Sequence, residues 1–363
     1  MIRKRQGVVQ EILDVDDAVT EILVEVENKF QKAVNYTQLT GPVSVGDKII
    51  VNTSAVYLNL GTGGYHFVIH NYNNDHSDFS NLDGHIMKLR YTPMQLKCLA
   101  VEEPQSPYHK TLQKLDRIDG MHVLIGSLHS MLSPAAHILK HHRPHLKIAY
   151  IMTDSACLAM PYSKTVKRLK RQDCLTCTIT CGQAFGGDYE AINIYTALLT
   201  ARHVCQCDVA LITPGPGVVG TQSLLGFSGV EEGHIIDAVN TLKGVPIFIP
   251  RVSFADPRER HRGMSHHTLT ILSKIAYSKA YIAVPVLEGK KHEVILDQIK
   301  NHGIDQKHRI RYIREESISV LEERNVNAKT MGRNIRQDPD FFSTVGAAAA
   351  LCLKIKTDFE MSL

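Results

Sequence analysis

The sequence predicts an α/β protein, in which a small N-terminal β-barrel-like domain precedes an open, mostly parallel, Rossmann-like sheet with three α/β/α layers. From about residue 121 onward, apolar runs rich in branched residues alternate with helical segments. This alternation is typical of right-handed βαβ crossovers. Residues 1 to about 70 contain only strand-like runs separated by turn residues, which indicates a separate all-β domain.

The all-β domain is expected over residues 1–70, with strands at residues 7–13, 20–27 and 48–52. In the second run Ile22, Val24 and Val26 alternate with glutamates, so one face is apolar and the other charged. Residues 71–120 show weaker periodicity and are assigned to an irregular or β connecting region. The Rossmann-like domain is assigned to residues 121–363.

Strands of the parallel sheet are predicted at residues 123–126, 147–152, 175–180, 208–213, 246–250, 281–286 and, with a weaker signal, 309–313. Helices are predicted at residues 134–142, 163–171, 189–204, 231–242, 266–277 and 291–302, with an Ala-rich closing helix over 345–353. Ligands of open α/β sheets bind beyond the carboxyl ends of the strands. The residues that follow each strand are therefore the candidates for a site.

The composition indicates a soluble globular protein. The 363 residues are 44% hydrophobic and 21% charged, and the net charge of +4 is too balanced to indicate nucleic-acid binding. No apolar run reaches the length of about 20 residues that crosses a bilayer, and the N-terminus lacks the apolar segment of a signal peptide. Eight cysteines without such a signal favour free thiols and a cytoplasmic location, with no membrane partner.

A loop rich in glycine and proline follows the predicted strand at residues 208–213. It begins with Pro214-Gly215-Pro216-Gly217 and continues to Gly220 and Thr221. Glycine permits positive φ and close approach of a ligand to the backbone. We expect the N–H groups of this loop and of the next helix start to bind an anion. The loop matches no dinucleotide or P-loop fingerprint, so a rigid turn is the alternative and hydride transfer is disfavoured.

Ionisable side chains follow several predicted strands. Five residues are assigned catalytic roles: His129, His261 or His266 transfers protons, and Asp154 or Asp188 orients the histidine. Ligand contacts are assigned, besides the glycine loop, to Ser127, Gly186, Gly187, Arg258 and Arg262, since guanidinium groups bind phosphate bidentately. As an alternative, Asp154, Asp188, Glu190 and His261 hold Mg²⁺, Mn²⁺ or Zn²⁺. Asp188 also has a structural interpretation, as N-cap of the helix predicted from residue 189.

These features favour an enzyme, a hydrolase or transferase acting on a small phosphorylated or otherwise anionic ligand. A homo-oligomer is compatible with the sequence. The alternative from another class is a non-catalytic ligand sensor or adaptor that contacts its partner through the N-terminal barrel. RNA association, through the barrel and the basic helix predicted at residues 163–171, is the weaker alternative. A fold of this class does not decide between them.

Several stretches together resemble an uncharacterised bacterial family, domain of unknown function 3866. They are residues 60–67, 84–93, 185–190, 214–221, 263–268 and 338–346, and they span nearly the whole chain. The resemblance implies no reaction and no site residues. Gln222 stands where it leads us to expect glycine, which loosens the glycine loop further.

Overall fold

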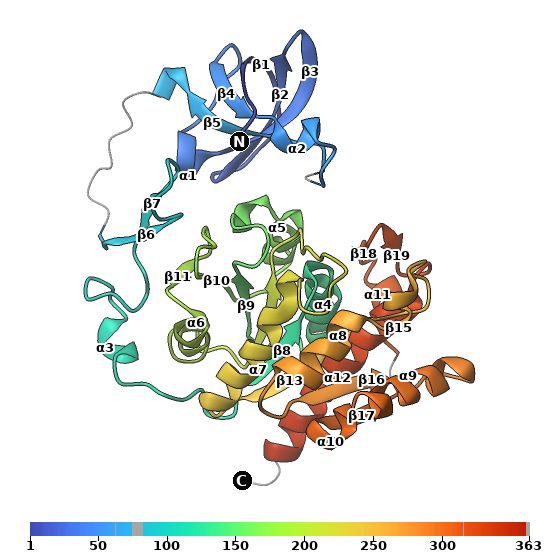
Figure 1. Ribbon diagram of the computed structural model, residues 1–363. Coiled ribbons are helices and arrows are strands. Elements are labelled where there is room, and N and C mark those ends of the chain that lie inside the picture. Colours follow the sequence, from blue (N-terminus) through green and yellow to red (C-terminus); the bar gives the residue numbers. More distant parts are fainter. Residues whose placement is uncertain (62, 75–82, 315, 361–363) are drawn as a thin grey trace. The chain divides into compact units, whose positions relative to one another are not determined.

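The computed structural model describes residues 1–61, 63–74, 83–314 and 316–360, with backbone only for 356–360. Thr62 of the family-like motif and residues 75–82 of the expected connecting region lie outside the described residues. The chain divides into two compact units, Met1–Leu99 and Ala100–Leu363 (Figure 1).

The first unit contains a closed five-stranded barrel, which confirms the predicted barrel-like domain. Its strands are β1 (Lys4–Val15), β2 (Val19–Val26), β3 (Lys29–Tyr36), β5 (His66–Asn71) and β4 (Lys48–Asn52), in the order β1-β2-β3-β5-β4. Ile22, Val24 and Val26 point into the barrel core, as their alternation predicts. A hairpin of β6 (Ile86–Lys88) and β7 (Leu96–Cys98), two one-turn helices α1 (Thr37–Thr40) and α2 (Ser54–Tyr57), and a 3-10 turn (Tyr72–Asn74) complete the unit.

The second unit is built on an eight-stranded sheet that is parallel throughout, which confirms the predicted fold class. The strand order is β11-β10-β9-β12-β8-β13-β16-β17. The strands are β8 (His122–Gly126), β9 (Ile148–Thr153), β10 (Cys177–Cys181), β11 (Tyr189–Ala191), β12 (Val209–Pro214), β13 (Val245–Ile249), β16 (Tyr281–Pro285) and β17 (Arg309–Ile313). The central strands are buried on both faces, as their continuous apolar runs predict.

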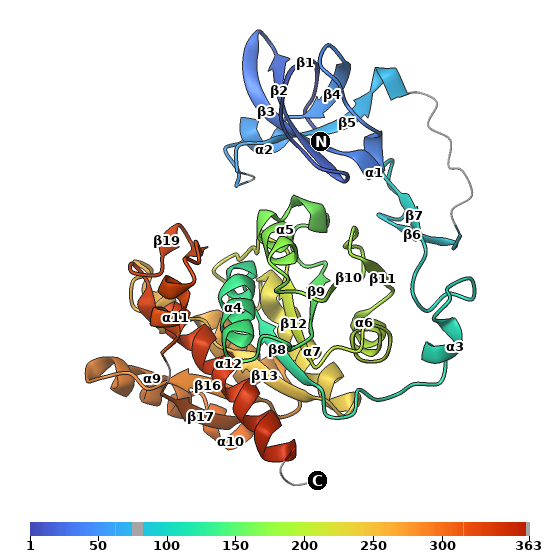
Figure 2. The ribbon, with the colours of Figure 1, turned by 180° about the vertical axis from the view of Figure 1, so that it is seen from behind.

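Helices cover both faces of the sheet, and each face has its own apolar core (Figures 1 and 2). One face carries α4 (Leu132–His142), α5 (Lys164–Arg171), α11 (Ser317–Glu323) and α12 (Pro339–Glu360). The other carries α3 (His109–Leu112), α6 (Ile194–Leu199), α7 (Glu231–Thr241), α8 (His266–Thr270), α9 (Lys290–Asn301) and α10 (Ile304–Lys307). Two short ribbons, β14 (Val252–Ser253) with β15 (Gly263–Met264) and β18 (Lys329–Thr330) with β19 (Arg333–Asn334), lie outside the main sheet.

The predicted helix at residues 189–204 was wrong at its start. Residues Tyr189–Ala191 pair with β10 as the edge strand β11, and helix α6 begins only at Ile194. Its cap is Asn193, whose side chain accepts hydrogen bonds from the backbone N–H groups of Tyr195 and Thr196. Asp188 is therefore not an N-cap. The three-residue pairing that creates β11 depends on β10 and has no local sequence signal.

The predicted closing helix is the long helix α12, which begins at Pro339 and packs against α4 and β16. Ala347, Ala348 and Ala349 are completely buried in it, because small side chains let the helix approach the sheet closely. Within the described residues, no helix combines the length and the hydropathy needed to cross a bilayer.

Candidate functional site

The topology has a switch point at the carboxyl ends of β8 and β12. These strands are neighbours, yet α4, which follows β8, and α7, which follows β12, cover opposite faces of the sheet. Chains that leave neighbouring strands toward opposite faces open a crevice between the strand ends. The segments that follow β8, β9, β12 and β13 meet near this switch point, and we call them the carboxyl edge.

The glycine loop after β12 rests against the segment after β9. A Cβ atom at Gly215 would lie 2.4 Å from the carbonyl oxygen of Cys157, and the Cys157 N–H donates to the Pro216 carbonyl at 3.0 Å. Gly217 has a φ of +102°, and the loop from there to Gly220 is largely exposed. Within the described residues, the N–H groups of Gly217, Val218 and Gly220 donate no hydrogen bond. The predicted binding of an anion by these groups stays a prediction.

Helix α7 begins at Glu231, as the sequence predicts, so ten residues separate Gly220 from the N-terminus of this helix. Thr221 is engaged within the loop itself. The N–H and Oγ1 of Thr221 both donate to the Gly226 carbonyl, at 2.8 and 2.9 Å. This hydrogen bonding folds the loop back on itself, and Gly220 thereby forms an isolated antiparallel bridge with Phe227. The Thr221 hydroxyl proton therefore serves the loop and is not directed at a ligand.

The far end of the glycine loop lies on a cluster of histidines that follows β13. A Cβ atom at Gly220 would lie 3.2 Å from Cε1 and 3.3 Å from Nε2 of His267. Phe227 stacks on the His267 ring, with 4.0 Å between ring centroids and 9° between planes. The His261 and His266 rings lie 5.3 and 4.1 Å from the His267 ring. The structure thus brings the predicted glycine and histidine segments together, and adds His267.

These three imidazoles are held neutral in a positive environment. Burial, followed by the charges of Arg251 and Arg258, lowers the pKa of His261 to about 3. The pKa of His267 falls to about 4, mainly through burial and then through His266 and the nearby arginines. His261 is anchored through a 2.7 Å hydrogen bond between its Nδ1 and Ser265 Oγ. His266 Nε2 is buried and has no hydrogen-bond partner among the described residues.

The arginines after β13 are divided between structure and surface. The buried Asp256 carboxylate accepts hydrogen bonds from Arg251 at 2.8 Å and from Arg258 at 2.9 and 2.8 Å, and Arg333 lies 3.5 Å away. Arg258, predicted as a ligand contact, is therefore already paired, although 38% of its side chain remains exposed. Arg262 is exposed, and its guanidinium lies 5.7 Å from the Phe254 ring centroid. Arg262 is therefore more available to a ligand than Arg258.

The predicted proton-transfer residue His129 lies beneath the glycine loop. Its Nδ1 donates to the Pro214 carbonyl at 3.2 Å, so its neutral Nε2 accepts from Ser163 Oγ at 2.7 Å. This is the arrangement of an activated hydroxyl and an oriented base. Ser163 is only 4% exposed and also caps α5, so a substrate does not reach it in this conformation. Burial lowers the pKa of His129 to about 4.

The predicted site residues next to His129 and at the end of β9 take different positions. Ser127 is buried directly after β8. Asp154 is exposed beyond β9, and its Oδ2 accepts from the Gln183 N–H at 2.8 Å. Asp154 therefore remains at the carboxyl edge with a charge that faces solvent.

Two carboxyl groups at the start of α7, those of Glu231 and Glu232, were not predicted as site residues. Oε1 of Glu231 accepts hydrogen bonds from Thr153 Oγ1 and from Ser155 Oγ, the latter at 2.6 Å. Burial raises the pKa of Glu231, although these hydrogen bonds act to lower it. Glu232 is fully buried, neither of its oxygens has a partner among the described residues, and burial raises its pKa well above the usual range. The sequence signal that could have pointed to these two residues was a pair of adjacent glutamates at the start of the first helix predicted after the glycine loop.

Asp188, Glu190, Gly186 and Gly187 do not join the carboxyl edge. The Asp188 carboxylate accepts from the N–H and Oγ1 of Thr178, and Glu190 accepts from Thr180 Oγ1 and from the Gly186 N–H. The Gly187 N–H donates to Thr180 Oγ1 at 3.3 Å. These groups lie alongside β10, because the loop turns back to start β11 parallel to it. Their hydrogen bonds are used within the fold.

The predicted metal site was wrong in its ligand set. Asp188 and Glu190 are tied to β10, whereas His261 is bonded to Ser265 beyond β13. These strands are separated in the sheet by β9, β12 and β8. In the part of the chain that the structure describes, no three His, Cys, Asp or Glu side chains converge in a way that would hold a metal ion.

Comparison with curated proteins finds no match to this chain. A family model described as "Protein of unknown function (DUF3866)" matches residues 32–349, which include β4, β5 and part of β3 of the barrel and the whole parallel sheet with its carboxyl edge. Because this match covers well over half of the sequence, the chain belongs to the DUF3866 family.

Proposed function

We propose that this protein is a hydrolase or transferase that binds a small phosphorylated or otherwise anionic ligand at the carboxyl edge of the sheet. One observation carries the proposal. Gly220 of the glycine loop lies directly on the ring of His267, 47 residues later in the chain, so that unpaired backbone N–H groups and neutral imidazoles share one surface. Backbone N–H groups in a loop form a site for an anion.

The electrostatics support an anion at this surface. Burial lowers the pKa of His266 and His267 most, and the positive charges of Arg251, Arg258 and Arg260 lower it further. The same positive potential attracts an anion, and a bound anion in turn raises the pKa of the neighbouring imidazoles. Arg260 and Arg262 are exposed and can approach phosphate oxygens.

The loop has different proton-transfer groups on its two sides. Toward β13, the neutral His267 and His266 are suited to accept a proton from an attacking water or hydroxyl group. Toward β9, Glu231 has a raised pKa and is held by Thr153 and Ser155, so it is suited to donate a proton to a leaving group. A base and an acid on two sides of an anion site fit hydrolysis or group transfer.

A thermal-shift screen against inorganic phosphate, nucleotides, sugar phosphates and divalent metals tests this proposal. We expect at least one anion to raise the midpoint at millimolar concentration in the wild type. His267→Gln should reduce that shift, while His145→Gln, at an exposed histidine after α4, should not. A screen in which no anion raises the midpoint, or in which both variants respond alike, contradicts the proposal. The adaptor and RNA alternatives stay hypotheses.

A further inference from the structure

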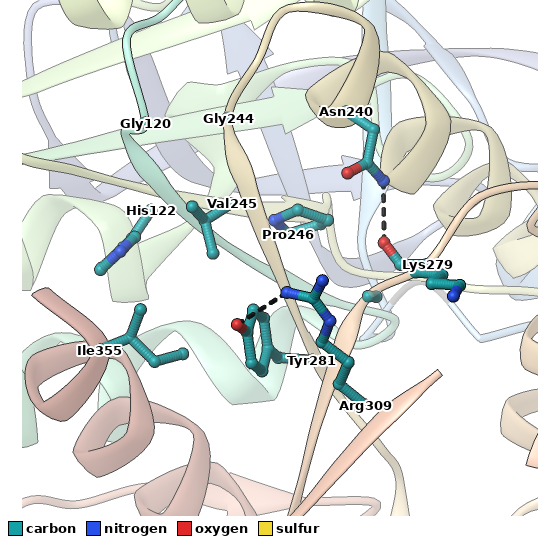
Figure 3. Close-up of a pocket in the computed structure, with 11 residues that line it drawn as sticks. Gly120, His122, Asn240, Gly244, Val245, Pro246, Lys279, Tyr281, Arg309 and Ile355 are labelled. Atoms are coloured by element: carbon teal, nitrogen blue, oxygen red, sulfur yellow. Dashed lines mark hydrogen bonds between the residues drawn. The ribbon is translucent and has the colours of Figure 1, made fainter. Parts of the chain in front are cut away.

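A cavity of about 320 Å³ lies at the opposite, amino edge of the same sheet (Figure 3). Four of its lining residues, His122, Val245, Tyr281 and Arg309, are the first residues of β8, β13, β16 and β17. These strands are consecutive neighbours in the sheet, so the cavity spans their amino ends. Its volume is within the range of small-molecule sites. The carboxyl edge uses none of its residues.

The cavity has an apolar side and a cationic side. Val245, Pro246 and Ile355 supply aliphatic surface, and the Tyr281 ring lies beside them (Figure 3). Lys279 and Arg309 supply the positive charges. Neither cation forms an ion pair within the described residues. Their charges are therefore available to a ligand.

Arg309 is oriented by the cavity wall. Its Nη1 donates a 2.9 Å hydrogen bond to the Tyr281 hydroxyl, and its guanidinium carbon lies 5.2 Å from the centroid of the same ring. One guanidinium edge is thus used by tyrosine, and the other N–H groups remain as donors. On the opposite side, the Asn240 amide donates to the Lys279 carbonyl at 2.8 Å and to Ser278 Oγ at 2.7 Å, which fixes the backbone that carries Lys279.

We propose that this cavity is a second ligand site, which binds a small monocarboxylate with a compact apolar or aromatic body. The carboxylate pairs with Arg309 and Lys279, and the body packs on Tyr281 and the aliphatic wall. A guanidinium binds a carboxylate through parallel hydrogen bonds, and an aromatic ring stacks favourably against another. An anion without an apolar body, such as phosphate, leaves the aliphatic wall exposed to water and binds more weakly here.

A structural explanation of the two cations gives different expectations. Lys279 and Arg309 lie near the C-terminal end of α7, where positive charge complements the helix dipole. If that were their whole role, Arg309→Gln would lower stability slightly and would have no effect on the binding of any small molecule.

Calorimetric titration of the full chain with benzoate, benzamide and inorganic phosphate tests the proposal. Benzamide has the shape of benzoate without its charge. We expect measurable benzoate binding, at least tenfold weaker binding of benzamide, and a loss of about tenfold or more in benzoate affinity for Arg309→Gln. The matched control is Arg311→Gln, because Arg311 lies on the same strand and 5.6 Å from the same ring but does not line the cavity.

Three outcomes would overturn this proposal. Benzoate does not bind at millimolar concentration, benzamide binds as well as benzoate, or Arg309→Gln and Arg311→Gln weaken binding equally. Tyr281→Leu supplies a second variant in case Arg309→Gln fails to fold, and it should also reduce benzoate affinity. Phosphate binding that depends on His267 and not on Arg309 belongs to the carboxyl edge. The two proposals therefore fail independently.

Discussion

The two edges of the parallel sheet differ in what the chain places on them. At the carboxyl edge, long segments after β12 and β13 bring together an open glycine loop, partly buried neutral histidines and a buried ion network. At the amino edge, short turns at Gly120 and Gly244 lead straight into β8 and β13, around an apolar cavity with two cations. Parallel strands send all their carboxyl ends to one edge, so one sheet has two chemically distinct rims.

The largest effect is expected from the ion network that holds the carboxyl edge. Asp256→Ala removes the carboxylate shared by Arg251, Arg258 and Arg333. We expect a loss of about 3–5 kcal/mol in the free energy of unfolding, because it leaves Arg251 buried without its partner. Urea denaturation measures it.

Asp116→Ala is the matched control for this network. Asp116 pairs with Arg117 on the surface, where both side chains are mostly exposed, and such pairs contribute little. The network also makes a pH prediction. The arginines lower the pKa of Asp256 far below its unfolded value, so its contribution is present above pH 4 and is lost as the pH falls toward the folded-state pKa. If both variants lost the same free energy of unfolding, the network would stabilise the protein no more than a surface ion pair does.

The next largest effect is expected from the acid sensitivity of His129, at the carboxyl edge. Burial holds the pKa of His129 at about 4, below its ordinary value of 6.5. The neutral form is thus favoured by folding, and this stability is present above pH 6.5 and lost as the pH falls toward 4. Between pH 7 and pH 5 we expect His129 to account for about 2 kcal/mol of the lost stability.

Urea denaturation of His129→Gln at both pH values measures this contribution. The variant should lose about 2 kcal/mol less than the wild type between pH 7 and pH 5, whatever its stability at pH 7. His145→Gln, at an exposed position, should follow the wild type. If all three proteins lose the same stability, His129 is protonated without unfolding, and the interpretation of its burial is wrong.

A smaller effect separates the glycine loop from an equivalent turn in the barrel unit. Gly217 and Gly46 have φ values of +102° and +90°, and at either position a Cβ atom would meet no other atom within 4 Å. Alanine should cost about 1 kcal/mol at both, because both conformations are strained for an L side chain. Only Gly217→Ala should also weaken the anion-dependent thermal shift. Equal anion responses would separate the loop from the site.

The smallest effect is expected at the amino edge. Arg309→Gln and Arg311→Gln should each change the free energy of unfolding by less than about 0.5 kcal/mol, since both side chains are exposed. Urea denaturation of the two variants measures this change. A large loss for Arg309→Gln alone would show that its hydrogen bond to Tyr281 supports the fold, and it would sharpen the contrast with the carboxyl edge.

The strands that the sequence predicted well are those buried on both faces. The run at residues 208–213 becomes β12 and the run at 123–126 becomes β8. Both were predictable because a continuous apolar run indicates a strand that is buried on both faces. Strands β3, β5 and β11 were among those missed. The first four residues of β3 are Lys-Phe-Gln-Lys, and β11 has only three residues. Such strands are stabilised by pairing with a neighbour, which no local pattern records.

The candidate site shows the same division between local and tertiary information. The glycine loop and His261 and His266 were predicted from their place after buried strands. His267, Glu231 and the Ser163 partner of His129 were not predicted as site residues, since only contacts across the fold give them a role. Asp188 and Glu190 were misplaced, because the loop before β11 returns along β10 and uses their carboxylates as acceptors.

By itself, the sequence determined a barrel followed by a parallel α/β sheet, and a glycine loop at the carboxyl end of a central strand. These are local properties, since apolar periodicity and turn chemistry act over a few residues. Only the tertiary structure decided that Gly220 lies on His267, that Asp256 gathers three arginines, and that four strand starts enclose a cavity. Such contacts join residues far apart in the chain, and their energies exist only once the sheet has assembled.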